Sequence, residues 1–93
     1  KESTEGVKSM DYALVREQGV TFAVVVVKPH ILNSPASREK AQIEFAQHFT
    51  LGTPIILMAQ NVRGIPKYYG RKDIVRFLSS IDHRRLPWKR KSI

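Results

Sequence analysis

The sequence predicts a small α/β protein built on a short parallel sheet. Two predominantly apolar runs, residues 20–27 and 54–59, show no regular polar alternation, which is typical of parallel strands buried on both faces. The segment between them has the spacing of a helix, so the three elements make a strand–helix–strand unit with a right-handed crossover. The whole chain has 93 residues, a length that corresponds to a single domain.

The first element is predicted to be a helix over residues 10–18. Ser9 is suited to cap its start, and Gly19 is suited to end it in the left-handed conformation. Helical spacing places four side chains on one face, namely Met10, Ala13, Leu14 and Glu17.

The central helix is predicted to begin after Ser34, with Pro35 at its first position, and to continue to about residue 49. Ala41 and Phe45 mark the apolar face that packs on the sheet. A last helix over about 71–82 follows from the spacing of Ile74, Phe77, Leu78 and Ile81. Together the elements predict a three-layer, Rossmann-like βαβ unit with a helix at each end.

Two strands cannot form a stable sheet alone, because buried strands also need neighbours at their edges. Either residues 67–69 form a short third strand that covers one edge, or a second copy of the chain completes the sheet. We expect self-association to complete the sheet. The predicted organisation is a flexible lead-in over 1–8, the α/β domain over 9–82 and a basic tail over 83–93.

The composition also bears on disulfides, metal sites and the location of the protein in the cell. There is no cysteine, so neither a disulfide nor a cysteine metal site is available. The longest apolar run, residues 22–27, is far shorter than the roughly 20 residues that span a bilayer. We expect a cytoplasmic protein that does not enter a membrane.

The net positive charge lies entirely in the last third of the chain. Residues 1–62 hold six basic and six acidic side chains, whereas residues 63–93 hold ten basic and two acidic ones. This second group accounts for the whole net charge of +8. Such asymmetry favours an anionic partner, either a nucleic acid or the phosphate of a nucleotide.

Residues 22–58 resemble half of a TIR-type or nucleoside deoxyribosyltransferase-like domain. The resemblance rests on the apolar run AVVVV, the helix sequence REKAQIEFA and the second run PIILM, and it covers about 40 % of the chain. In those families a glutamate on the helix after the strand acts on a glycosidic bond. The resemblance therefore implies Glu39 or Glu44 as a catalytic residue.

Two loops follow the carboxyl ends of the predicted strands, where open α/β sheets bind ligands. A second anion site is predicted at the start of the last helix, where Tyr68 and Tyr69 either stack on a base or pack in the core. Loop polarity alone also explains these side chains. The candidate anion-binding residues are Lys28, His30, Asn61, Arg63, Arg71 and Lys72.

The predicted tail combines basic clusters with one indole. Pro87 prevents a helix there and favours an extended backbone that can follow a chain of phosphates. Trp88 either stacks on a base or folds back on the apolar core. The candidate nucleic-acid-binding residues are Arg84, Arg85, Trp88, Lys89, Arg90 and Lys91.

Neither a cofactor nor a metal is indicated, because the three histidines have no ligand spacing and no cysteine accompanies them. Three functions remain open. They are a binding module for an anionic partner, a nucleotide- or nucleoside-handling enzyme of the TIR or deoxyribosyltransferase type, and a structural oligomerisation domain. We favour the binding module and lean against enzymatic activity.

Overall fold

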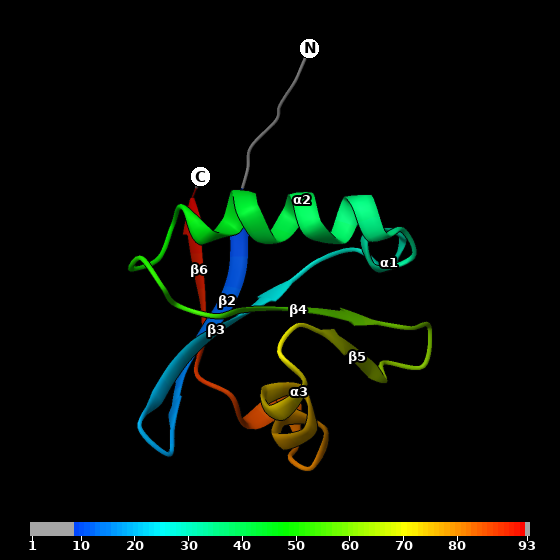
Figure 1. Cartoon of the computed structure of the whole chain (residues 1–93). Coiled ribbons are helices and arrows are strands. Elements are labelled where there is room, and N and C mark those ends of the chain that lie inside the picture. The colour runs from blue at the N-terminus through cyan, green and yellow to red at the C-terminus, as the bar shows by residue number, and fades with distance from the viewer. Residues whose placement is uncertain (1–8, 93) are drawn as a thin grey trace.

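Five strands form one mixed sheet in the computed structural model, which describes residues 9–92 (Figure 1). The strands are β2 (Ser9–Glu17), β3 (Val20–Val26), β4 (Ile55–Gln60), β5 (Pro66–Tyr69) and β6 (Trp88–Ser92). The helices are α1 (Pro29–Leu32), α2 (Pro35–Ala46), α3 (Lys72–Ser79) and a 3-10 turn, η1 (His83–Arg85). The sheet order is β5-β4-β3-β2-β6. The lead-in predicted over 1–8 lies outside the described residues.

The strand–helix–strand prediction is confirmed. β3 and β4 are adjacent and parallel, with Val24 opposite Ile56, and α2 connects them. Ser34 caps α2 by accepting a hydrogen bond from the Ser37 N–H at 3.4 Å. The side-chain amide of Gln42 then ties the helix to β4 by donating to the Ile55 carbonyl at 2.8 Å. The last predicted helix is also present as α3, although it is shorter than expected.

The helix predicted over 10–18 is wrong, because this segment is strand β2. Met10 packs in the core on one face of the sheet, while Ala13 packs in the core on the other face. A strand with both faces buried does not show period-two alternation, so its apolar residues imitate a helical face. Pairing with β3 and β6 then outweighs the local preference.

Gly19 therefore belongs to a hairpin rather than to a helix end. Glu17 pairs with Val20, which leaves Gln18 and Gly19 as a two-residue turn between β2 and β3. Both turn residues have positive φ, 51° and 80°, as a type I′ turn requires. This tight turn fixes the register of the hairpin.

The predicted parallel sheet is also incorrect, since among the strands of residues 9–92 only β3 and β4 pair in parallel. β5 pairs antiparallel with β4, and β2 pairs antiparallel with β3. The two buried strands therefore find their neighbours within the chain. The need that motivated self-association is met, and self-association stays a prediction.

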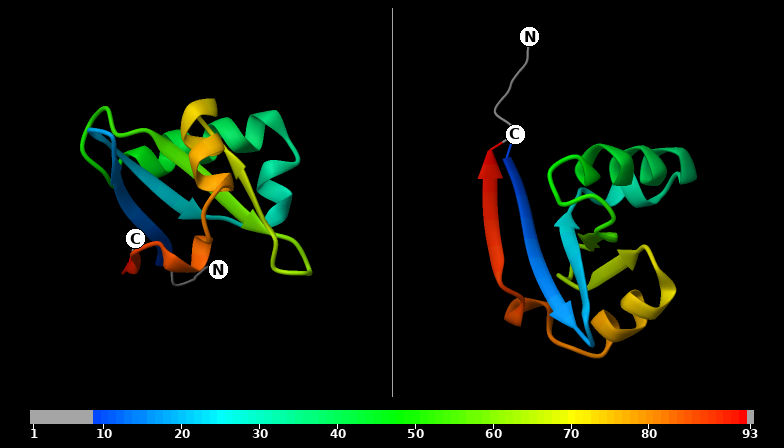
Figure 2. Two further views of the ribbon diagram at one scale, coloured as in Figure 1. Left: turned by 90° about the horizontal axis from the view of Figure 1, so that it is seen from below. Right: turned by 60° about the vertical axis from the view of Figure 1, so that its left-hand side comes forward.

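The tail predicted over 83–93 is part of the sheet. Residues 83–85 form η1, and β6 pairs antiparallel with β2, so that Ser92 lies opposite Ser9. Figure 2 shows the two strands side by side at the edge of the sheet. The extended backbone was expected, whereas its place in the sheet was not.

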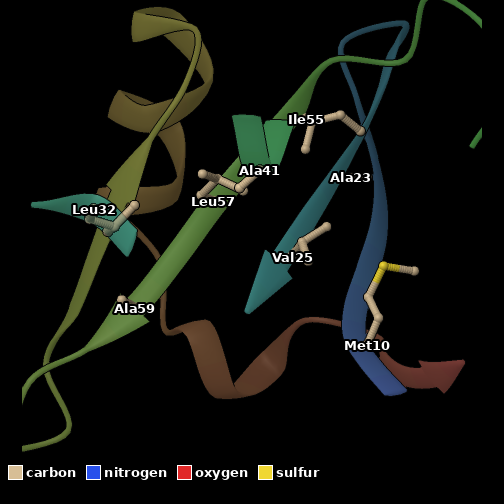
Figure 3. Close-up of a cluster of buried hydrophobic side chains, with 8 residues drawn as sticks. All are labelled: Met10, Ala23, Val25, Leu32, Ala41, Ile55, Leu57 and Ala59. Carbon is tan, nitrogen blue, oxygen red and sulfur yellow. The ribbon is translucent and has the colours of Figure 1, made fainter. Parts of the chain in front are cut away.

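Apolar clusters lie on both faces of the sheet. Figure 3 shows the first cluster, in which side chains of β3 and β4 meet Leu32 and Ala41 from α1 and α2. The second cluster joins the opposite faces of the same strands to Ile74 and Leu78 of α3. Leu86, just before β6, is buried in this second cluster. The segment after α3 is thereby held against the core.

Candidate functional site

A cleft of about 690 Å³ opens on the sheet face that α3 covers in part. α3 lies over Phe22, whose ring meets that of Phe77 edge-on at 6.4 Å between centroids. Val26 and Met58, near the carboxyl ends of β3 and β4, lie in the cleft, and η1 and β6 close its side. The lining residues are Asp11, Val26, Met58, Gln60, His83, Arg84, Trp88, Lys89 and Arg90.

Three polar contacts fix one wall of this cleft. The Gln60 amide nitrogen lies 2.8 Å from Nε2 of His83 and donates to the Gly64 carbonyl at 3.1 Å. An amide nitrogen can only donate, so Nε2 of His83 is the acceptor of this pair. The Trp88 indole N–H donates to the His83 carbonyl at 2.8 Å. The amide, the imidazole and the indole are thus oriented by one network.

Two arginines at the cleft are held by carboxylates. Nε of Arg90 lies 2.8 Å from Asp11, and the Arg84 guanidinium donates to both oxygens of Asp82 at 3.0 and 2.9 Å. The side-chain and backbone hydrogen bonds from Arg84 lower the pKa of Asp82 to about 2. Each guanidinium has five N–H groups, so donors remain for a ligand after these contacts. The pairing therefore orients the cations without exhausting their donors.

The chemistry of the cleft suits an anion that carries a flat ring. Its three cations, Arg84, Lys89 and Arg90, exceed by one the two carboxylates, Asp11 and Asp82, that pair with the arginines, and this excess favours negative charge. Half-buried Val26 presents apolar surface with the buried Met58 beneath it, and part of the Trp88 indole lies beside them. Pockets with a mostly apolar interior and a few oriented polar groups are typical binding sites for small ligands.

Four of the six tail residues singled out in the sequence line this cleft. They are Arg84, Trp88, Lys89 and Arg90. The other two do not: Arg85 is exposed on η1, and the Lys91 ammonium lies 3.4 Å from the His48 carbonyl. Of the two alternatives for Trp88, packing against the core is observed, and the part-buried indole still borders the cleft.

The other predicted anion-binding residues are spread over separate hollows. Lys28 and His30 line a groove of about 400 Å³ between α1 and α2, together with Glu44. Asn61 lines a different hollow, and its Oδ1 accepts from the backbone N–H groups of residues 63 and 65 in the β4–β5 turn. The loops after β3 and β4 do share that hollow, as parallel pairing requires, although Lys28, His30 and Arg63 are not part of its lining.

At the start of α3 the predicted anion site contains an ion pair. Arg71 binds Asp73 through two hydrogen bonds, at 3.1 and 2.6 Å, and this contact lowers the pKa of Asp73. Lys72 is exposed. Tyr68 and Tyr69 pack against the two core clusters, and the Arg38 guanidinium lies 4.4 Å from the centre of the Tyr69 ring.

Sequence reasoning missed five residues of the cleft. Gln60 follows from the sequence only as a polar residue at the end of the second predicted strand, and His83 only as one of three histidines without metal-ligand spacing. Asp11 was assigned to a helix, and Val26 and Met58 were assigned to the core. Only the pairing of β2 with β6 brings Asp11 beside Arg90, and the two are 79 residues apart in the chain.

The catalytic candidates lie on α2, outside the cleft. Glu39 is exposed, and Glu44 is exposed at the groove that Lys28 and His30 border. Within residues 9–92, no group of three His, Asp or Glu side chains is placed to hold a metal ion. None of the helices in the described part of the chain is long and apolar enough to cross a membrane.

Comparison of the chain with models of protein families, with curated proteins and with solved structures finds no match. The resemblance of residues 22–58 to TIR-type and deoxyribosyltransferase-like domains therefore stays a prediction.

Proposed function

We propose that this protein is a binding module for nucleic acid, which it holds by its phosphates at the cleft and along β6. The observation that carries the proposal is the position of the basic C-terminal segment. The fold brings Arg84 and Arg90 to one hollow, which Lys89 borders, while the side chains of Lys89 and Lys91 extend from the other face of the same edge strand. Phosphate contacts of this kind supply most of the affinity in sequence-independent binding.

The shape of the edge supports the same partner. β6 is the outermost strand, so one of its sides has no neighbouring strand among residues 9–92. Its five residues span about 13 Å from first to last Cα at roughly 3.3 Å each. Lysines and arginines along such an edge discourage pairing with another strand. They also place positive charge on both faces of the edge, Arg90 on the α3 face and Lys89 and Lys91 on the α2 face, where a flexible polyanion can wrap around it.

The experiment is a titration of a labelled single-stranded oligonucleotide at several salt concentrations. The variant to compare with the wild type is Lys89→Gln/Arg90→Gln/Lys91→Gln. Each phosphate contact on a single strand contributes about 0.7 to the slope of log affinity against log salt. Removing three contacts should therefore flatten the slope by about 2 units.

The matched control is Arg16→Gln/Lys40→Gln/Arg76→Gln, which removes three exposed charges outside the cleft. It lowers the net charge equally and should leave the slope within about half a unit of wild type, since no phosphate contact is lost. Equal slopes for both variants would mean that only net charge matters and would contradict the proposed surface. Absence of binding at low salt would contradict the function itself.

One observation favours the enzymatic alternative. Glu44 lines a single groove with His30 and Lys28, which places a carboxylate, an imidazole and an ammonium in one hollow. The resemblance of residues 22–58 implies glycosidic-bond chemistry for such a glutamate. A glycohydrolase assay with nucleosides and dinucleotides tests this alternative. The enzymatic alternative requires that the wild type turns over substrate and that one of the two variants, Glu44→Gln or Glu39→Gln, loses this activity while the other keeps it.

A further inference from the structure

We infer that the cleft holds one unpaired base, so that the protein selects single-stranded over duplex nucleic acid. This inference rests on the proposed function and adds to it the part of the ligand that enters the cleft. The phosphates account for the cations on the rim. Phosphate binding alone gives no reason for the apolar lining of the cleft or for the oriented side-chain amide of Gln60.

The size and lining of the cleft fit a flat heterocycle. A volume of about 690 Å³ falls in the usual range of about 300–1,000 Å³ for small-ligand sites. Half-buried Val26 offers a small apolar patch over the buried Met58, and Trp88 stands at its side. Stacking on an aromatic ring is the commonest way in which proteins hold single-stranded bases without regard to sequence. A phosphate alone gains nothing from these three side chains.

The polar groups inside the cleft are already oriented for hydrogen bonding. The two amide hydrogens of Gln60 are taken up by His83 and by the Gly64 carbonyl. The carbonyl oxygen Oε1 of that amide is left as an acceptor. Base edges carry N–H donors that match such an acceptor. Because the network fixes the side chain beforehand, a base that binds there does not have to order it.

Duplex nucleic acid cannot use this subsite without distortion. A paired base is stacked on both sides, and extruding it requires breaking its stacking and pairing. In a single strand the bases already rotate freely enough to enter a hollow. The cleft should thus discriminate by strandedness, while the charges along β6 attract both forms.

The test uses intrinsic fluorescence, because Trp88 is the only tryptophan in the chain. Four probes are compared: a single-stranded oligonucleotide of about ten nucleotides, its duplex, an abasic strand of equal charge, and a mononucleotide. The single strand should change the Trp88 emission and should bind at least about tenfold more tightly than the duplex. The abasic strand should bind about fivefold to a hundredfold more weakly. A mononucleotide should change the emission only at much higher concentration.

Variants assign the effect to the cleft. Gln60→Ala should weaken single-strand binding and leave the salt slope unchanged, and Gln47→Ala, an exposed glutamine after α2, should change neither. Equal affinity for the abasic strand and the normal strand, with unchanged emission, would overturn the base subsite and leave the phosphate surface standing. Failure of every probe to bind would overturn both. If the mononucleotide saturates the protein at the same concentration as the strand, the ligand is a free nucleotide and the inferred single-strand selectivity is wrong.

Discussion

Replacing Trp88 by alanine should destabilise the whole fold, because the segment after α3 is a strand of the sheet. The indole packs against the apolar cluster under α3, and its N–H donates to the His83 carbonyl at 2.8 Å. Its backbone pairs with Ala13, a fully buried residue of β2. The substitution removes both the packing and the hydrogen bond.

The magnitude follows from these two losses. A fully buried tryptophan costs about 3–5 kcal/mol when truncated to alanine, and a part-buried one about 2–3 kcal/mol. Loss of the indole hydrogen bond adds about 1 kcal/mol. The sum, about 3–4 kcal/mol, is a large share of the roughly 5–14 kcal/mol expected for a domain of this size. The corresponding decrease in Tm is about 12–25 °C.

The assay is urea denaturation followed by far-ultraviolet circular dichroism, since the variant has no tryptophan to observe. Trp88→Phe should cost about half as much, because the ring still packs while the hydrogen bond is lost. Lys91→Ala, on the same strand and exposed, should stay within about 0.5 kcal/mol of wild type. A Trp88→Ala protein as stable as Lys91→Ala would refute the assignment of β6 to the sheet.

Three further outcomes are expected. Gln18→Asn should raise the free energy of unfolding by about 1 kcal/mol in the same urea assay, because asparagine tolerates the positive φ that Gln18 adopts. Gly70→Ala should lower it by about 1–3 kcal/mol, since a Cβ there would meet the Ile56 side chain and lie 3.2 Å from the Ile55 carbonyl oxygen. Asp82 has a pKa of about 2 when folded against 3.8 unfolded, so its contribution is complete above pH 3.8 and lost as the pH falls through 2. Melting curves between pH 5 and 2 should fall less steeply for Asp82→Asn, and an unchanged pH profile would contradict the Arg84 contact.

The sequence predicts the centre of the fold well and its edges poorly. β3, α2 and β4 are found because each carries a local signal: a continuous apolar run, a cap at Ser34 and a four-residue spacing. β2 is missed because its apolar residues serve both faces of the sheet. β6 is missed because Lys89, Arg90 and Lys91 look like a solvated tail, as befits an edge strand.

Only those residues of the candidate site that stand out in the composition of the chain could be predicted from the sequence. The charge asymmetry indicated Arg84, Lys89 and Arg90, and the lone indole indicated Trp88. The hydrogen bond from Gln60 to His83 spans 23 residues, and the ion pair of Asp11 with Arg90 depends on a strand pairing that no local pattern reveals. Such contacts are set by topology rather than by spacing.

The most direct test of the account is a two-dimensional NMR titration of the protein with a short single-stranded oligonucleotide. The indole N–H of Trp88, the side-chain amide of Gln60 and the backbone amides of β6 should shift together and saturate at one concentration. The amides in the first half of α2, at the end next to α1 and away from Lys91, should stay in place. Shifts centred on Lys28 and His30, with the Trp88 and Gln60 signals unmoved, would contradict the cleft as the binding site.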